Sequence, residues 1–361
     1  MGASARAAPH PMSTSPPPSR IDTDPRQRLL ADWLATLPDD YALAIETLRP
    51  ASSDASFRRY FRIDSGSPRH PTLIVMDAPP PMEDCRPFVH AAQVFASSGM
   101  TVPRVLESDL ARGFLLLEDL GSRVYLDELD EARADAMYAD ASRALVGAQL
   151  ASRPGVFPDY SRELLLRELM LYPDWYVAKH KGVELGSAQQ EALMRAFDLL
   201  LENNLAQPRV HVHRDYHSRN LMVLEGDANP GVLDFQDAVY GPITYDLVSL
   251  LRDAYVKWPE ERVLDWAIRH WERSRRAGLP VSRDFSDFYR DFEWMGLQRH
   301  LKVLGIFARL YRRDGKDRYL ADLPLVLEYV ISAASRYAAL TPLLKVIEQV
   351  EGRTPRVGYT F

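Results

Sequence analysis

The sequence has only one cysteine, Cys85, among its 361 residues. A disulfide requires two cysteines, so an internal disulfide framework is excluded and a reducing, cytoplasmic environment is expected. Apolar runs of about 20 residues, long enough to cross a membrane, are also missing. The first 24 residues are rich in Pro, Ser and Ala and lack the apolar block of a signal peptide, so we expect residues 1–24 to form a disordered leader.

The chain has no excess of positive charge either. Its formal net charge is −6, which gives no indication of a nucleic-acid partner. Hydrophobic residues make up 46% and charged residues 26%, as in ordinary globular proteins, and the length is typical of two domains or two lobes. We therefore expect small-molecule partners, no membrane partner, and a monomeric or weakly dimeric state.

Residues 25–121 show the pattern of a small sheet with few helices. One helix is predicted from Pro25 to about Leu37 and another from about Glu83 to Ser98. Strand-like runs bounded by turn residues occupy residues 41–48, 56–63, 71–78 and 113–117.

After Gly121 helical periodicity prevails. It covers residues 133–151, 161–180, 188–206 and 245–350, with two short strands between them at 221–224 and 231–234. This order predicts an α+β, two-lobe fold. We expect an antiparallel-sheet N-lobe at 25–121 with a hinge at 117–121, and a mainly helical C-lobe at 122–361.

The polar segment between residues 210 and 247 raises three possibilities. Zinc could use three nearby histidines, but no cysteine is close and the surrounding oxygen donors suit magnesium better. These histidines are His211, His213 and His217. A serine nucleophile is disfavoured because Ser218 has no G-x-S-x-G turn around it.

The third possibility is phosphoryl transfer. Asp215 and Asn220 form H-R-D-x-x-x-x-N in a loop at 213–220, and Asp234 opens D-F-Q-D at 234–237. Asp215 would take the proton of an acceptor hydroxyl, while Asn220 and Asp234 would hold the Mg²⁺ that bridges the phosphates of ATP. The alternative is a polar hairpin whose Asp and Asn side chains only cap turns.

Several motifs carry a family resemblance. HRDYHSRN resembles the D-x-H-x-x-N loop of the aminoglycoside-phosphotransferase-like kinases, which share a two-lobe fold with protein kinases, and LDFQDAVYGPITYDLVSLL resembles their metal-aspartate segment. With SFRRYFRI, LIVMDAPP, FLLLEDLG and LQRHLKVLGIFARLYRRDGK, the set looks like the bacterial anomeric kinases of cell-wall recycling. The resemblance implies ATP- and Mg²⁺-dependent phosphorylation of the anomeric hydroxyl of N-acetylmuramate or N-acetylglucosamine.

The resemblance also implies roles for individual residues. It makes Asp215 the catalytic base and gives Asn220 and Asp234 to the metal. Four residues would support the loop, namely His213, Arg214, His217 and Asp246, the last also as a helix N-cap. Two alternatives stay open: a kinase of the same fold for an aminoglycoside, choline or homoserine, and a catalytically silent nucleotide-binding relative.

One departure from such kinases concerns the third strand. LIVMDA lacks the lysine that pairs with the α- and β-phosphates. We expect Arg58 or Arg59 to approach the nucleotide instead, with help from Ser53 and Ser56, because arginine binds phosphate through a bidentate fork. A solvated strand face is an equally good explanation of these arginines.

The remaining ligand contacts are predicted from position and residue type. The hinge residues Glu118 and Leu120 would offer backbone groups to adenine, as in kinases of this fold. Three apolar side chains would line the adenine slot, namely Val75, Leu117 and Leu233. For the acceptor, basic residues beside an apolar helical stripe favour an anionic sugar, and an exposed tryptophan offers an aromatic platform. These acceptor residues are Arg299, His300 and Trp175.

Overall fold

A computed structural model describes residues 24–53 and 57–352. Within these bounds the chain forms two compact units. Of the described residues, the first comprises 24–53, 57–84 and 106–119, and the second comprises 85–105 and 120–352. The predicted leader, apart from Asp24, lies outside the described residues. In the part of the chain that is described, no helix combines the length and apolarity needed to span a membrane.

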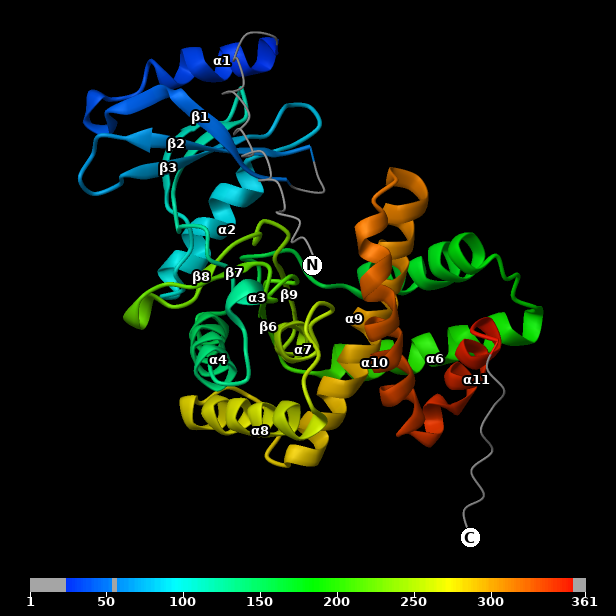
Figure 1. The fold of residues 1–361 in the computed structure, drawn as a ribbon. Helices are drawn as coiled ribbons and strands as arrows, with labels where there is room; N and C mark the ends of the chain where they lie inside the picture. The colour runs from blue at the N-terminus through cyan, green and yellow to red at the C-terminus, as the bar shows by residue number, and fades with distance from the viewer. Residues whose placement is uncertain (1–23, 54–56, 353–361) are drawn as a thin grey trace, which may run out of the picture. The chain divides into compact units, whose positions relative to one another are not determined.

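The first unit is a five-stranded sheet covered on one face by a helix (Figure 1). Helix α1 runs over Pro25–Leu34, and the side chain of Asp24 caps it by accepting a hydrogen bond from Arg26 N at 2.9 Å. The strands are β1 (Leu43–Ser53), β2 (Arg59–Ser65), β3 (Thr72–Asp77), β4 (Val105–Asp109) and β5 (Phe114–Glu118). Their order in the sheet is β1-β2-β3-β5-β4.

Strand alternation decides which side chains meet α1. Neighbouring strands pair antiparallel, with Phe61 opposite Val75 and Val75 opposite Leu116. These three side chains are buried with Leu30 and Trp33 of α1 in one apolar core. Because side chains of a strand alternate between faces, the next residues along each strand belong to the opposite face of the sheet.

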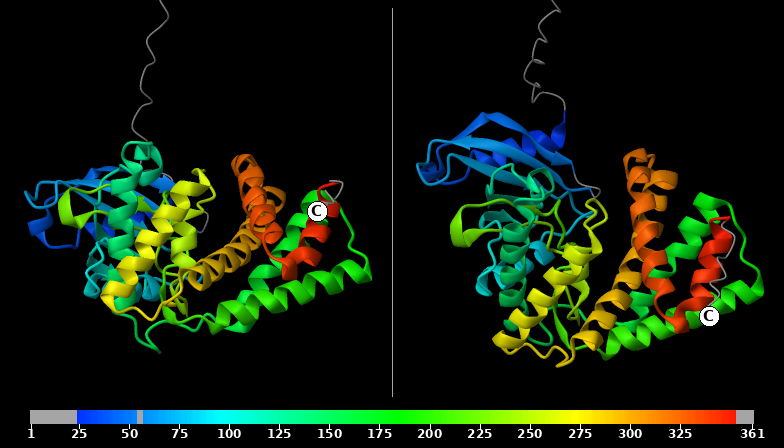
Figure 2. Two further views of the ribbon diagram at one scale, coloured as in Figure 1. Left: turned by 90° about the horizontal axis from the view of Figure 1, so that it is seen from below. Right: turned by 60° about the horizontal axis from the view of Figure 1, so that its bottom comes forward.

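The second unit is mainly helical. Helix α2 (Arg86–Ser97) belongs to it, because Phe88 and Phe95 pack against Phe235. Figure 2 shows α9 running beside α6 and α10, while α11 packs against α6 and α10 in the same helical bundle. The other helices are α3 (Tyr125–Glu128), α4 (Ala134–Leu150), α5 (Arg162–Leu169), α6 (Ser187–Ala206), α7 (Tyr245–Leu251), α8 (Glu260–Ala277), α9 (Phe285–Asp314), α10 (Leu323–Ser335) and α11 (Thr341–Val350), with a 3₁₀ segment η4 (Asp317–Asp322).

Two short antiparallel ladders interrupt the helices. Strand β6 (Arg209–Val212) pairs with β9 (Val239–Pro242), and β7 (Leu221–Met222) pairs with β8 (Gly231–Val232). The hairpin β7–β8 was predicted, whereas β9 was not. The loops that connect these strands hold the polar segment singled out in the sequence.

The helix expected over residues 161–180 is not continuous. It divides into α5 and a π-helix, η2 (Tyr172–Lys181). Pro173 has no N–H to continue the α-helical hydrogen bonds, and wider π turns take over at this point. Helix α9 passes very close to the start of this π-helix. A Cβ added to Gly305 of α9 would lie 2.4 Å from the carbonyl carbon of Leu171.

Candidate active site

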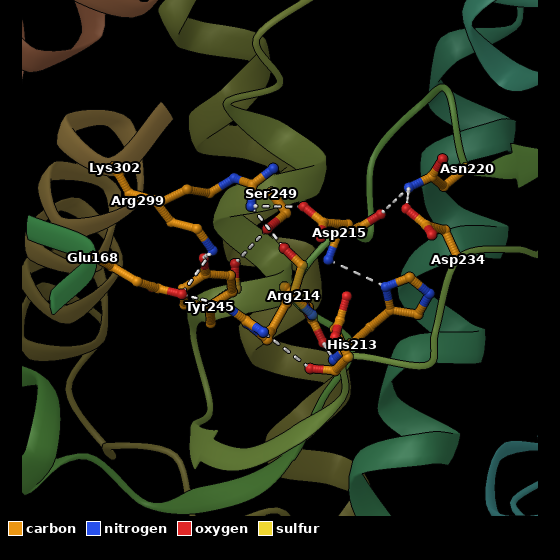
Figure 3. Close-up of polar contacts among 12 residues, drawn as sticks. Glu168, His213, Arg214, Asp215, Asn220, Asp234, Tyr245, Ser249, Arg299 and Lys302 are labelled. Carbon is orange, nitrogen blue, oxygen red and sulfur yellow. Dashed lines mark hydrogen bonds and ion pairs between the residues drawn. The ribbon is translucent and has the colours of Figure 1, made fainter. Parts of the chain in front are cut away.

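The loop between β6 and β7 is wound tightly around Asp215. His217 N donates to Asp215 O at 3.0 Å, and Asn220 N donates to His217 O at 2.9 Å. The side-chain amide of Asn220 donates to the same carbonyl of Asp215 at 2.9 Å. These bonds close the loop into successive turns, so the five-residue spacing brings Asp215 and Asn220 together (Figure 3).

Asp246 holds the start of this loop. Its two carboxylate oxygens accept hydrogen bonds from His213 N at 2.7 Å and from Arg214 N at 2.9 Å. Arg214 has a φ of 78°, a strained left-handed conformation that these bonds help to maintain. Burial raises the pKa of Asp246 to about 7, although both backbone N–H groups lower it. Asp246 lies inside α7 and Thr244 is the N-cap, which corrects the predicted capping role.

His213 has a defined tautomer because both of its ring nitrogens have partners. Its Nδ1 accepts from Asp215 N at 3.2 Å, so Nε2 carries the proton and donates to Leu233 O at 3.0 Å. Burial lowers the pKa of His213 to about 4, and the ring is neutral at pH 7. It therefore links the loop to the segment that leads into Asp234 and is not a metal ligand.

Asn220 and Asp234 form the pair of oxygen-bearing side chains expected at a magnesium site. Asn220 Nδ2 donates to Asp234 Oδ2 at 3.3 Å, and Leu233 N donates to Asn220 O at 2.9 Å (Figure 3). Asp234 has a φ of 65°, which turns its carboxylate out of the strand direction, and Gln236 donates to Oδ1 at 2.8 Å. Mg²⁺ commonly uses one or two protein oxygens together with phosphates and water, so this pair fits it.

The three histidines of the segment do not converge. His211 Nε2 accepts from Arg153 N at 3.1 Å, whereas the ring of His217 packs edge-on against Tyr255. Among the described residues, no three His, Cys, Asp or Glu side chains are grouped so that they could hold a metal ion. The zinc hypothesis is therefore not supported.

A buried charge network from α5 and α9 surrounds Asp215. Arg299 Nη1 donates to Arg214 O at 2.7 Å and lies 3.7 Å from Asp215 Oδ1. One turn further along α9, Lys302 Nζ lies 3.1 Å from Glu168 Oε1 and donates to the hydroxyl of Tyr245 at 3.1 Å. Arg214 also forms an ion pair with Glu168 (Figure 3). The hydroxyl of Tyr160 donates a hydrogen bond to the same glutamate.

This network controls the ionisation of Asp215. Burial by itself raises the pKa of that carboxyl, but the positive charges of Lys302 and Arg299 outweigh burial and hold the pKa well below its usual range. The side chain of Asp215 nevertheless remains 39% exposed. It is thus an ionised carboxylate that an acceptor hydroxyl can reach.

Residues 47–284 match the phosphotransferase enzyme family. The chain belongs to this family. It is 52% identical over 296 residues to the N-acetylmuramate/N-acetylglucosamine kinase of Pseudomonas aeruginosa, covering 82% of this chain and 86% of that protein. The kinase of the same name from Neisseria meningitidis serogroup B is 48% identical over 345 residues, which is 93% of this chain and 99% of that one.

The solved structure of a choline kinase from Cryptosporidium parvum has the same fold. It superimposes with a TM-score of 0.59 at 11% identity, covering 89% of this chain and 99% of that one. This likeness confirms the predicted protein-kinase-like α+β fold. The predicted membership of the phosphotransferase family is confirmed by the match of residues 47–284 and by the two related kinases. At this identity the likeness concerns the fold alone.

In this phosphotransferase, the β2 arginine proposed for the nucleotide has other partners. Arg59 Nε donates to Asp77 Oδ2 at 3.0 Å, and its guanidinium also pairs with Asp24. Asp77 lies at the end of β3, is fully buried, and pairs with Arg26 of α1 at 2.7 Å. Arg59 would have to leave these carboxylates to bind a phosphate.

The other residues proposed for phosphate binding are only partly described. Arg58 follows the undescribed segment and is half-buried. Ser56 and the side chain of Ser53 lie outside the described residues. The nucleotide role of Arg58, Ser53 and Ser56 therefore stays a prediction.

The predicted adenine contacts are corrected at one position. Val75 is fully buried in the core beneath α1, so Ile74 and Met76, not Val75, belong to the opposite face of β3. Leu117 of β5 also belongs to that opposite face, because Leu116 next to it packs toward α1 and side chains alternate along a strand.

The other predicted adenine contacts can be described separately. Glu118 and Leu120, within the predicted hinge, are half-buried. Leu233 is half-buried between Val232 of β8 and Asp234. Their contact with adenine stays a prediction.

The predicted acceptor residues are of three kinds. His300 is 2% exposed, and its Nε2 donates to Arg252 O at 2.9 Å. Burial lowers its pKa to about 3. It therefore belongs to the core, which corrects its predicted contact with the acceptor sugar. Arg299 contacts Asp215 and the loop backbone, although it was predicted to contact substrate. Trp175 lies half-buried in the π-helix, where its platform role stays a prediction.

Two residues near Asp215 in the fold or the sequence were not predicted. They are Glu168 of α5 and Arg219 of the catalytic loop. Glu168 was not singled out, because an isolated glutamate in an amphipathic helix is usually solvent-exposed. The i, i+3 spacing of Arg299 and Lys302 on an otherwise apolar stripe was the available indication of a buried charge pair. Arg219, in the catalytic loop itself, was also passed over.

Proposed function

We propose that this phosphotransferase is an ATP-dependent kinase that phosphorylates the anomeric hydroxyl of N-acetylmuramate and/or N-acetylglucosamine, as in peptidoglycan recycling. The observation that carries the proposal is the placement of an ionised, accessible Asp215 beside the Asn220–Asp234 pair. The names of the relatives at 52% and 48% identity supply the substrate class.

Each residue contributes a separate part of the reaction. Asp215 accepts a hydrogen bond from the acceptor hydroxyl and orients its oxygen toward the γ-phosphate of ATP. As the new bond from that oxygen to phosphorus forms, the bond between the γ-phosphorus and the β,γ-bridging oxygen breaks, ADP leaves, and Asp215 receives the proton of the hydroxyl. Asn220 and Asp234 would hold Mg²⁺, which neutralises the phosphate oxygens when bound. Arg299 fixes the backbone of the loop through Arg214 O, so that Asp215 keeps its orientation.

The low basicity of Asp215 fits an anomeric acceptor. A carboxylate whose pKa lies well below its usual range is a weak proton acceptor, so it suits a hydroxyl that gives up its proton readily. A hemiacetal hydroxyl is more acidic than an ordinary alcohol.

The test is an ATP-consumption assay with a panel of N-acetylmuramate, N-acetylglucosamine, an aminoglycoside, choline and homoserine. We expect turnover of the N-acetylated sugars, and we expect Asp215→Asn to lower kcat by at least about 100-fold, the usual contribution of a general base. Asp227→Asn is the matched control, because Asp227 is an exposed aspartate in the neighbouring β7–β8 hairpin and not in the catalytic loop. Turnover of an amino alcohol instead, or of no acceptor by the wild type, would reject the proposal.

The cytoplasmic location and the monomeric or weakly dimeric state expected from the sequence remain predictions. Size-exclusion chromatography with light scattering measures the second. Use of ATP and Mg²⁺ is tested in the same assay by replacing ATP with GTP and by adding a chelator.

A further inference from the structure

Arg219 lies flat on an aromatic ring within the catalytic loop. Its guanidinium carbon is 3.6 Å from the centroid of the Tyr255 ring, and its side chain is 38% exposed. Its one ion-pair partner among the described residues is Asp322 of η4, at 4.0 Å, the outer limit of such a pair. No hydrogen bond from this guanidinium to a described residue is present.

The ring beneath Arg219 is fixed from the other side. Tyr255 packs edge-on against His217 at 5.4 Å and contacts Phe307 of α9 at 6.2 Å, and Phe307 packs on Tyr319 at 5.1 Å. A stacked guanidinium keeps the N–H groups of its edge in one plane and directed away from the ring. Such an arginine is prepared to bind a planar anion.

The position of Arg219 in the loop places it near the acceptor. It immediately precedes Asn220, whose side chain contacts the backbone of Asp215 at 2.9 Å. Asp215 and Arg219 therefore lie four residues apart in one tightly wound loop, and both side chains are accessible, at 39% and 38% exposure. The first would hold the hydroxyl that reacts, and the second is available to a substituent elsewhere on the same small molecule.

We propose that Arg219 is a specificity-determining residue that binds a carboxylate substituent of the acceptor sugar, while Tyr255 keeps its guanidinium in plane. The inference rests on the proposed function and extends it. A carboxylate offers two oxygens to the planar N–H edge, which makes a bidentate pair that the distant Asp322 does not form. N-acetylmuramate carries a lactyl carboxylate that N-acetylglucosamine lacks, so Arg219 favours the former.

The first experiment compares the two sugars in the Arg219→Gln variant. We expect kcat/KM for N-acetylmuramate to fall about 10- to 100-fold, the usual effect of losing a charge-assisted hydrogen bond, with a much smaller loss for N-acetylglucosamine. Arg318→Gln is the matched control, since Arg318 also lies over a tyrosine ring, 5.0 Å from Tyr319, but is exposed on η4 outside the loop. Equal losses for both sugars would show a merely structural role.

A second experiment uses a variant that should lower, and not raise, KM for N-acetylmuramate. Asp322→Asn removes the carboxylate that competes for Arg219, so KM for N-acetylmuramate should fall, while KM for the neutral sugar should stay the same. An unchanged or higher KM for N-acetylmuramate would contradict the competition. Arg219→Lys should recover only part of the preference, because an ammonium group cannot make the bidentate contact.

Binding measurements separate this inference from the proposed function. Calorimetry with N-acetylmuramate and its uncharged methyl ester measures recognition of the carboxylate without turnover. The wild type should bind the acid about 10-fold or more tightly, and Arg219→Gln should bind both alike. If the wild type binds acid and ester equally, the inference fails even where both sugars are phosphorylated. If the acid is preferred but no sugar is turned over, the kinase proposal fails instead.

Discussion

At the scale of single residues, the site depends on charges that are buried together. Glu168 is 5% exposed and lies between Lys302 and Arg214, each of which is also largely enclosed. Burial raises the pKa of Glu168, yet the two cations lower it below its ordinary value. The three groups compensate one another, so the removal of one leaves an unpaired charge in the interior.

Glu168→Gln should therefore destabilise the protein strongly. Two cations would lose their shared anion, and we expect the free energy of unfolding to fall by about 3–5 kcal/mol, measured by urea denaturation at pH 7.5. Glu191→Gln removes an exposed pair with Arg195 and should change stability by less than about 0.5 kcal/mol. If both variants have the same midpoint, the buried network does not contribute as argued.

At the scale of elements, α9 links the catalytic loop to the helical bundle. It carries the two cations Arg299 and Lys302 of the Asp215 network. Further along the helix, Phe307 contacts the Tyr255 ring. Gly305 lies close to the backbone of Leu171. The length and start of α9 follow from Asp284, whose side chain accepts from Ser286 N at 2.8 Å, and from its apolar periodicity. Its partners come from distant parts of the sequence.

Gly305→Ala should separate α9 from η2. The new Cβ would lie 2.4–2.5 Å from the carbonyl group and Cβ of Leu171, and backbone atoms cannot move aside as a flexible side chain can. We expect a loss of about 1–3 kcal/mol in thermal or urea unfolding. Gly296→Ala in the same helix meets nothing nearer than 3.7 Å and should be neutral or stabilising, because alanine favours helix. A neutral Gly305→Ala would show that the two helices are free to move apart.

The elements also show what sequence patterns reveal. The starts of α1, α2 and α6 and the hairpin β7–β8 lie within a few residues of the prediction, because apolar periodicity and turn residues act locally. The break at Pro173 was missed, since amphipathic spacing continues through it. The proximity of Asp215, Asn220 and Asp234 was predictable, because a short loop and one hairpin bring them together, while their roles stay predictions. The contact between Glu168 and Lys302 was not, because it depends on how α5 packs beside α9.

At the scale of the whole molecule, stability should depend on pH through several buried neutral histidines. Burial lowers the pKa of His213 to about 4 and those of His270 and His300 to about 3. In the unfolded chain each has an ordinary value near 6.5. Between pH 6.5 and about 3 the unfolded chain therefore binds more protons, so stability is fully present above pH 6.5 and is lost as the pH falls.

We expect the free energy of unfolding to drop by roughly 1–2 kcal/mol per buried histidine between pH 7.5 and pH 5. Urea denaturation at both pH values measures this. His270→Gln keeps a hydrogen-bonding side chain for Ser142, whose hydroxyl lies 2.8 Å from Nδ1 of His270, and should make the pH dependence shallower. An identical pH slope in this variant would contradict the assignment.

The pairing of Glu168 with Lys302 also bears on synthesis at the ribosome. Asp215 and its loop leave the exit tunnel well before α9 does, so for a time the nascent chain carries the reactive carboxylate without the two cations that tune it. The carboxylate and the cations that hold its pKa low thus lie on separate elements, and they meet only once α9 has packed beside the loop.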